Sequence, residues 1–158
     1  MEIKRLPVYY GGKLMPWGKA TIVKGNNGFV FLAGTEGRDP ELTPEFDGTR
    51  QTGSTVVTGA EAQTRMCLEK IRSGLEECGS SLEYICKMIY YIKGQAFPAG
   101  VAGSPTALAS AAVTNAFFKE YCPELCNDKN PPAKDLIGVT GLGDKDMVIE
   151  IAVTAAIP

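Results

Sequence analysis

The last quarter of the chain contains the feature that most limits how the whole chain can fold. Residues 131–142 and 147–155 are apolar stretches joined by a polar Gly-Asp turn, which predicts two strands. Glu150 lies in the middle of the second stretch, among apolar neighbours. Strand alternation places Val148, Glu150 and Ala152 on one face. A carboxylate on a half-buried strand is costly unless it is paired or reaches a cleft.

Lys134 offers this carboxylate a candidate partner. It follows the rigid pair Pro131-Pro132 and enters the first of the two strands. If the strands are neighbours in a sheet, the charges of Lys134 and Glu150 lie within reach of one another, which makes a candidate site. The plainer interpretation is structural: a solvated charge at a strand end, and a charge that protects an edge strand from aggregation.

The charge of the chain argues against nucleic acids and membranes as partners. A length of 158 residues predicts one domain over residues 1–158, which buries about two-thirds of its unfolded surface. The net charge is −2 and the basic residues are scattered, whereas such partners need clustered Lys and Arg. A basic patch formed only in three dimensions is the alternative. Without an apolar signal core or a membrane-spanning run, we expect a soluble cytoplasmic protein.

The chain has no histidine, and this limits its chemistry. Triads built on histidine and most zinc sites are removed, so a general acid or base must be Glu, Asp, Lys, Tyr or water. The five cysteines contain no CxxC pair and mostly lie in apolar patterns. That pattern favours burial as small hydrophobic residues over a redox or nucleophilic role.

Start and stop signals predict two helices. Residues 58–61 match a capping box, and the helix that follows ends at Gly79, a residue suited to a left-handed C-terminal cap. Ser104 and Pro105 give an N-cap and a first-turn proline to a second helix, which runs to about Tyr121.

Further apolar stretches predict strands. Residues 19–24 and 29–33 flank residues 25–28, whose sequence Gly-Asn-Asn-Gly is a hairpin turn signal. Residues 29–33 are apolar on both faces and are expected to form a central strand. Residues 85–92 are rich in aromatic and branched side chains and predict another strand. Residues 1–18 are expected to be irregular.

This order of elements predicts an α+β domain, with a single mixed sheet and two helices packed on one face. The second face of such a sheet lies bare unless another subunit covers it, because residues 29–32 are apolar on both sides. We therefore expect an oligomer.

Several short stretches together resemble the Rid family of reactive intermediate deaminases, also called YjgF. They lie in the family's order and cover the chain from about residue 16 to residue 155. They are Phe31-Leu32-Ala33-Gly34, Ala62-Gln63-Thr64-Arg65, Leu68-Glu69-Lys70-Ile71, Gly79-Ser80-Ser81-Leu82, Ala116-Phe117-Phe118-Lys119-Glu120, Pro132-Ala133-Lys134 and Ile149-Glu150-Ile151.

The resemblance implies a Rid-like (chorismate-mutase-like) fold that assembles as a homotrimer, with sites in the clefts between subunits. It implies hydrolysis of reactive enamines or imines, made from amino acids, to keto acids and ammonia, without a cofactor. The partners that it implies are a small-molecule substrate, expected to be a carboxylate, and further copies of the chain.

The family's site residues carry over one position at a time. Its Pro-Ala-Arg motif holds an arginine that grips the substrate carboxylate, and the matching residue is Lys134, a point charge in place of a planar fork. Glu150 matches the glutamate thought to position the attacking water, with one extra residue between the motifs. Trp17 matches the aromatic of the Pro-Tyr-Ser motif but lacks its hydroxyl. Ala111 matches the asparagine of the second helix but lacks its polar contact.

Three more residues complete the expected site. Backbone groups near Gly34 and Leu136 are expected to orient the reacting centre, and Arg38 to supply the fork that position 134 lost. The departures from the family pattern predict a divergent member with an altered ligand. The chain is also longer than typical members in three loops, at residues 37–57, 94–104 and 122–131.

The sequence leaves three functions open. The first is a hydrolytic deaminase or related hydrolase in which Lys134 holds a carboxylate and Glu150 acts as a general base on water. The second is other chemistry in the same cleft, such as tautomerisation or ring-product hydrolysis, or a Schiff base on a desolvated Lys134. The third is a non-enzymatic trimer that binds a metabolite or regulates another process.

Overall fold

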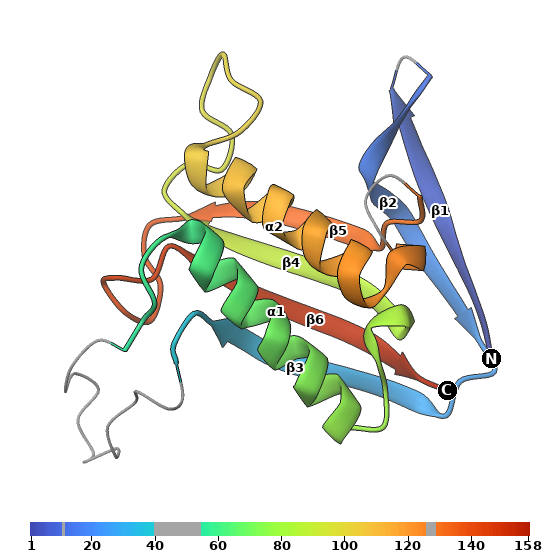
Figure 1. The fold of residues 1–158 in the computed structure, drawn as a ribbon. Helices are drawn as coiled ribbons and strands as arrows, with labels where there is room; N and C mark the ends of the chain where they lie inside the picture. Colours follow the sequence, from blue (N-terminus) through green and yellow to red (C-terminus); the bar gives the residue numbers. More distant parts are fainter. Residues whose placement is uncertain (11, 40–54, 126–128) are drawn as a thin grey trace.

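One mixed sheet forms the basis of the fold, and two helices cover one of its faces (Figure 1). The computed structural model describes residues 1–10, 12–39, 55–125 and 129–158. The strands are β1 (Glu2–Tyr10), β2 (Lys13–Lys24), β3 (Gly28–Glu36), β4 (Ile85–Lys93), β5 (Ala133–Val139) and β6 (Ile149–Ile157). The helices are α1 (Ala60–Glu77) and α2 (Pro105–Tyr121), with short 3-10 turns η1 (Leu82–Tyr84) and η2 (Pro123–Leu125). The sheet order is β1-β2-β5-β4-β6-β3, which confirms the predicted α+β architecture.

Both predicted helices are present, and they differ in how they begin. In α2 the Ser104 Oγ accepts a hydrogen bond from the Ala107 backbone N–H at 3.2 Å, as an N-cap does. In α1 the N-cap is Gly59, with no side-chain cap, so the predicted capping box is wrong. With Thr58 as the N-cap, the helix would start at Gly59. Gly59 instead has a φ of 93°, which is not a helical value, so the helix starts one residue later, at Ala60. The end of α1 at Gly79, with a φ of 74°, is as predicted.

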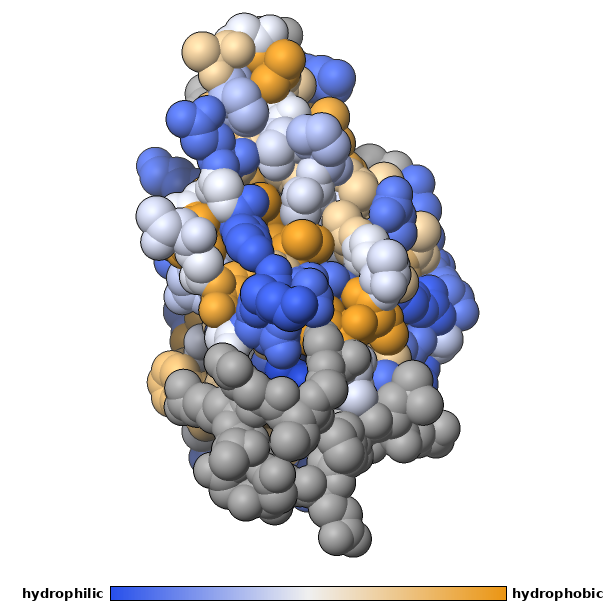
Figure 2. All heavy atoms as spheres, turned by 90° about the vertical axis from the view of Figure 1, so that its left-hand side faces the viewer, coloured by the Kyte–Doolittle hydropathy of each residue, from blue (hydrophilic) through white to orange (hydrophobic). Residues whose placement is uncertain are grey.

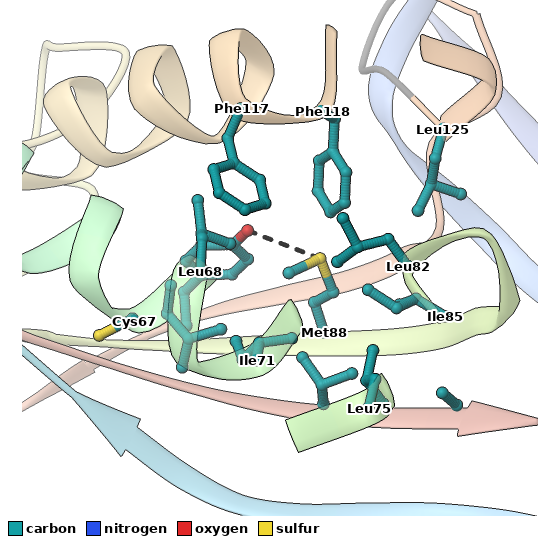
Figure 3. Packing of buried hydrophobic residues seen from close by; sticks show 14 of the residues in the cluster. Cys67, Leu68, Ile71, Leu75, Leu82, Ile85, Met88, Phe117, Phe118 and Leu125 are labelled. Atoms are coloured by element: carbon teal, nitrogen blue, oxygen red, sulfur yellow. Dashed lines mark hydrogen bonds between the residues drawn. The ribbon is translucent and has the colours of Figure 1, made fainter. Parts of the chain in front are cut away.

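The hydrophobic core lies between the helices and the sheet. Phe117 and Phe118 of α2 are fully buried, and their ring centroids lie 6.1 Å apart in an edge-to-face arrangement. They point toward Leu68 of α1 and Met88 of β4 (Figure 3). Burial of a side chain of this size contributes about 1.5–3 kcal/mol. The packing of α2 on β4 therefore fixes the part of the sheet next to the candidate site.

β3 is an edge strand and not the central strand that its apolar sequence predicted. Within the described ranges it pairs only with β6, with Phe29 opposite Ala156. The turn at residues 25–28 joins β2 to β3 without pairing them, so the predicted hairpin is wrong. β2 pairs instead with β1, in the segment expected to be irregular. The register of the β1–β2 pair shifts at Pro7, which lacks a backbone N–H. A proline within the segment argued against a strand there, so the sequence did not predict β1.

The two apolar strands of the tail are not neighbours, because β4 lies between them. β4 runs parallel to β5 and antiparallel to β6. The expectation that Lys134 and Glu150 lie on adjacent strands is therefore wrong. The predicted alternation within β6 is correct: Ile149 and Ile151 are fully buried against the helices, which turns Glu150 to the other face.

The face of the sheet away from the helices, called the open face below, exposes large apolar side chains. Phe29 is 47% exposed and Phe31 is 77% exposed, and their rings lie 6.5 Å apart. Ile137 of β5 is also exposed. Exposed apolar surface of this kind marks a site of association. The second face of the sheet is thus bare and apolar in a single chain, as the sequence predicted.

The end of the molecule where β3 and β5 finish has a mixed surface. The start of α1 and the turn between β5 and β6 lie at the same end (Figure 1). Seen face on, this end gathers hydrophilic side chains at its centre, between smaller hydrophobic groups (Figure 2). None of the helices in the described part of the chain has the length and apolar character needed to cross a membrane.

Candidate functional site

Lys134 lies in a cavity of about 430 Å³ between α2 and the sheet, called the Lys134 cavity below. Its register partner on β4 is Met88, a buried residue of the helix side, so Lys134 points toward α2. The cavity walls come from β4, β5, α2 and the loop before α2. The lining residues are Tyr90, Phe97, Ala102, Gly103, Ala107, Leu108, Ser110, Ala111, Thr114, Lys134, Asp135 and Leu136.

The surroundings of Lys134 make its ammonium group easier to deprotonate. Burial of the charged end lowers the pKa of Lys134 to about 8, because an ammonium group loses its hydration in an apolar cavity. An anion that entered the cavity would favour the charged form and raise this pKa again. At pH 7 most Lys134 side chains therefore still carry a positive charge, and the Lys134 cavity is a candidate site for an anion.

Two residues expected from the sequence line the same cavity as Lys134. Leu136 follows on β5 and faces the same way, opposite Tyr90 of β4. Ala111 of α2, the position matched to the family's asparagine, also lines the cavity. Ser110 and Thr114 of α2 also line the cavity, although no sequence pattern singled them out. Their spacing of four residues, on an alanine-rich helix, was the signal that could have indicated them.

Glu150 packs directly against Gly34 on the other side of the sheet. A Cβ added at Gly34 would lie 1.9 Å from the Glu150 Oε1 atom and 2.7 Å from Cδ, so only glycine leaves room for the carboxylate in this position. Burial, and then the negative charge of Glu36 opposite on β3, raise the pKa of Glu150 above the usual range. A carboxylate with a raised pKa is a better base for a proton transfer near neutral pH.

Gln63 of α1 holds the start of β6, which carries Glu150, and its role was missed in the sequence. Its Nε2 donates to the backbone oxygens of Val57 at 3.0 Å and Asp146 at 2.9 Å. Its Oε1 accepts from the Val148 backbone N–H at 2.8 Å. The side chain is buried, and it ties three chain segments together two residues before Glu150.

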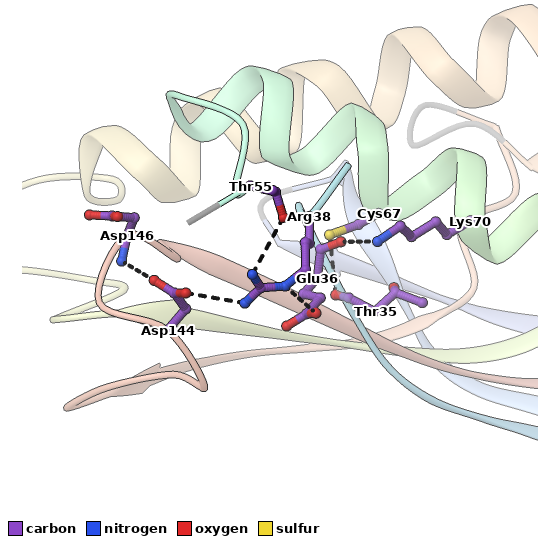
Figure 4. A network of polar contacts seen from close by, with 8 residues as sticks. All are labelled: Thr35, Glu36, Arg38, Thr55, Cys67, Lys70, Asp144 and Asp146. Carbon is purple, nitrogen blue, oxygen red and sulfur yellow. Dashed lines mark hydrogen bonds and ion pairs between the residues drawn. The ribbon is translucent and has the colours of Figure 1, made fainter. Parts of the chain in front are cut away.

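Arg38 belongs to a polar network at the end of β3, and it does not line the Lys134 cavity. Its Nε donates to Glu36 Oε1 at 3.0 Å and its Nη2 donates to Asp144 Oδ2 at 3.1 Å (Figure 4). The two carboxylates raise the pKa of Arg38 against the opposing effect of burial. Arg38 thus partly balances the charge beside Glu150, and it does not replace the planar fork at Lys134 within one chain.

The expected residues fall into two groups, on opposite faces of one sheet. Lys134 and Leu136 face α2, whereas Gly34 and Glu150 meet on the open face. Trp17 lies in β2 by its backbone, and its side chain is outside the described residues. Of the long loops, residues 40–54 and 126–128 also lie outside the described part of the chain. A single chain therefore does not bring the two groups of candidate residues together.

Comparison with known proteins identifies the family. The model of the endoribonuclease L-PSP family matches residues 14–157. A RutC family protein of Pyrococcus abyssi is 31% identical over 127 residues, which cover 80% of this chain and 77% of the relative.

Solved structures agree with this assignment at the level of the fold. YyfB of Yersinia pestis, a protein of the conserved Rid family, has a TM-score of 0.66 at 20% identity, with 99% of each chain covered. TdcF of E. coli with bound serine has a TM-score of 0.60 at 20% identity, with 96% of this chain and 93% of that chain covered. The chain belongs to the endoribonuclease L-PSP family, the family of the Rid and YjgF proteins.

Proposed function

We propose that the chain is a cofactor-independent hydrolase that deaminates the enamine or imine of a small amino acid, in a cleft between two copies of a homotrimer. Lys134 of one copy binds the substrate carboxylate, and Glu150 of a neighbouring copy activates the water. The observation that supports this most directly is the placement of Lys134, in a cavity on the helix side, and of the partly buried Glu150, on the open face, on opposite faces of one sheet. Only a second copy can bring such groups into one site.

The exposed aromatics of the open face support the contact that this proposal needs. Phe29 and Phe31 lie on the same face as Glu150, so a copy that covers them also approaches Glu150. The serine held by TdcF supports a ligand with a free carboxylate. In a homotrimer the same contact repeats around the ring, which creates three equivalent clefts.

The proposed reaction moves protons through Glu150 and needs no redox step. Glu150 accepts a proton from water as the water oxygen bonds to the carbon of the protonated imine, and the C=N π electrons move to the nitrogen. Glu150 then returns this proton to the nitrogen of the resulting carbinolamine. The C–N bond breaks as the carbinolamine hydroxyl gives its proton to Glu150 and C=O forms, and the departing ammonia takes that proton and leaves as ammonium. The products are a 2-oxo acid and ammonium. Lys134 holds the carboxylate throughout and keeps the reacting carbon in place.

A Schiff base on Lys134 is a second candidate, favoured by the lowered pKa of this lysine. A neutral amine attacks a carbonyl carbon to form a carbinolamine, which loses water to give an imine. Borohydride reduces such an imine to a stable secondary amine. We expect no adduct at Lys134 after treatment with pyruvate and borohydride if Lys134 serves only as the carboxylate anchor. A peptide in which Lys134 carries the reduced pyruvate adduct would favour the second candidate.

Although the family description names a ribonuclease, the charge of this chain does not suit RNA. RNA backbones are bound through clusters of Lys and Arg, and the net charge of −2 argues against such a surface. Incubation with single-stranded RNA is a useful arm of the assay, in which we expect no cleavage above background.

Ammonia release from imines made in place by an amino-acid oxidase tests the proposal. We expect the wild-type protein to accelerate release over spontaneous hydrolysis, and Glu150→Gln to lower this acceleration by about 100-fold or more, because the general base is lost. Lys134→Met is expected chiefly to raise KM. Glu76→Gln, an exposed glutamate on α1, is the matched control with unchanged rates. Full turnover by Glu150→Gln would show that the assignment of the base is wrong.

A further inference from the structure

The Lys134 cavity has a polar closed end and an apolar mouth. At the closed end Ser110 and Thr114 are only 1% exposed, and Lys134 adds the positive charge. At the mouth Phe97 is 62% exposed and Leu108 is 52% exposed, although both line the cavity. This gradient fits a ligand with a charged head and an apolar tail.

One hydroxyl at the closed end has no partner in the described part of the chain. The Ser110 Oγ atom is buried and makes no hydrogen bond, whereas the Thr114 Oγ1 atom is paired with the Tyr90 hydroxyl at 3.2 Å. Buried hydroxyls are nearly always paired, because burial without a partner is unfavourable. An unpaired hydroxyl that lines a cavity beside a lysine therefore indicates a group that a ligand satisfies.

The size of the cavity adds a second constraint on the ligand. A volume of about 430 Å³ lies in the range of sites that enclose drug-sized molecules. The three-carbon skeleton of alanine or serine fills only a small part of it. Part of the space lies next to Phe97 and Leu108, where an apolar group is favoured.

We infer that the Lys134 cavity takes a 2-imino or 2-oxo carboxylate with a branched aliphatic or aromatic side chain, and that Ser110 is a specificity-determining residue which hydrogen-bonds the imino or oxo group. The carboxylate lies against Lys134, the 2-position reaches Ser110, and the side chain extends toward Phe97 and Leu108. The inference rests on the proposed function for the 2-imino and 2-oxo head group. The preference for an apolar tail rests on the cavity alone.

Three small acids test this arrangement by calorimetry with the intact wild-type chain. Pyruvate and 4-methyl-2-oxopentanoate share a head group and differ in the tail, and 4-methylpentanoate keeps the branched tail but lacks the oxo oxygen. We expect 4-methyl-2-oxopentanoate to bind at least about tenfold more tightly than pyruvate, because its extra methylene and methyl groups are buried. Equal affinities of pyruvate and 4-methyl-2-oxopentanoate would overturn the inference.

Ser110→Ala separates the hydroxyl from the rest of the cavity. We expect it to weaken 4-methyl-2-oxopentanoate by about three- to tenfold, because one hydrogen bond is lost, and to leave 4-methylpentanoate unchanged. Ser73→Ala, on an exposed helical serine of α1 outside the cavity, is the matched control. An equal effect of Ser110→Ala on both acids, or no effect on either, would overturn the role of Ser110.

The binding inference and the proposed function can fail independently, and the measurements distinguish the two cases. If the branched oxo acid shows the Ser110-dependent preference but imines are not hydrolysed, the binding inference stands and the proposed function fails. If imines are hydrolysed in a Glu150-dependent manner but the affinities depend on neither the apolar tail of the acid nor the Ser110 hydroxyl, the proposed function stands and this inference fails.

Discussion

Lys134 lies in a largely apolar cavity, and its proposed role in binding an anion should depend on pH. Since burial lowers the pKa of Lys134 to about 8, the ammonium form dominates below this value and the neutral amine above it. Tyr90, which lines the same cavity, has its pKa raised by burial and stays neutral over this range. The affinity for a carboxylate ligand should therefore be constant below about pH 8 and fall above it.

We expect the affinity for 4-methyl-2-oxopentanoate to fall by up to about tenfold for each pH unit above 8, as the proton on Lys134 is lost. Calorimetry between about pH 6 and about pH 10 measures this dependence of the affinity on pH. Lys134→Arg, whose guanidinium stays charged, is expected to give a flat profile over the same range. A wild-type profile as flat as that of the arginine variant would contradict the assignment of Lys134 as the anion site.

Glu150 destabilises the fold when it is ionised. Its pKa in the folded chain is raised, chiefly by burial and then by Glu36, so the folded state binds more protons than the unfolded state between the usual pKa of a glutamate and the raised value. The free energy of unfolding therefore falls as pH rises through this window.

We expect Glu150→Gln to raise the free energy of unfolding at pH 7 by on the order of 0.5 kcal/mol, a small figure because solvent screens a partly exposed group. The gain should disappear below about pH 4, where the wild-type carboxyl is protonated as well. Urea denaturation at both pH values measures the difference. A glutamine variant that is less stable than the wild type at pH 7 would contradict this account of Glu150.

Gly34 reserves the space that the carboxylate of Glu150 occupies. We expect Gly34→Ala to displace the carboxylate and to lower turnover by about 10- to 100-fold, since a shift of an ångström at a reacting group has effects of this size. Stability should change by less than about 1 kcal/mol, because the side chain that must move is flexible at its end.

Gly141→Ala is the matched control, since a Cβ there meets nothing within 4 Å. In the Glu150→Gln background, Gly34→Ala should cause no further loss, because both changes act on the same group. Additive losses in the double variant would show that Gly34 acts on the reaction by another route.

At the scale of elements, Gln63 joins α1 to the segment that enters β6. Its amide serves three backbone groups and has little access to water. Gln63→Leu would leave these groups buried and unpaired, and we expect a loss of about 2–4 kcal/mol in the free energy of unfolding by urea denaturation. Gln95→Leu, at an exposed position, should cost less than about 0.5 kcal/mol. A loss below about 1 kcal/mol in the free energy of unfolding for Gln63→Leu would contradict the structural role of its three hydrogen bonds.

The sequence predicted those elements whose signals are local. The N-cap at Ser104, the glycine end of α1 and the alternation in β6 are set by residues a few positions apart, and all three are present. The sheet order could not be predicted, since it depends on which distant strands pair. Residues 29–32 read as a central strand because Phe29 and Phe31 are apolar, yet they lie on an edge strand with an exposed face.

The candidate site shows the same division between local and distant signals. The resemblance drew attention to Lys134 and Glu150, but their placement on opposite faces depends on β4 lying between β5 and β6. The only local signal at Ser110 is its spacing of four residues from Thr114, because the cavity that both residues line is built by four separate segments. Sequence patterns indicated the candidate residues, whereas their separation onto opposite faces of the sheet depends on the fold.

At the scale of the whole molecule, the account requires that adjoining copies share each site. Lys134 and Glu150 cannot meet within one chain, because they lie on opposite faces of the sheet. In a cyclic trimer each cleft then takes Lys134 from one copy and Glu150 from the next. A chain without Lys134 and a chain without Glu150 should therefore restore one complete cleft wherever they assemble in the right order.

Subunit complementation measures this most directly. At imine concentrations well below the raised KM of Lys134→Met, Lys134→Met and Glu150→Gln are each expected to release little ammonia alone. When equal amounts are unfolded and refolded together, three in four trimers are mixed and each mixed trimer has one intact cleft of three, so the account predicts about a quarter of wild-type activity. No recovery, in mixed trimers confirmed by native mass spectrometry, would contradict a site shared between copies.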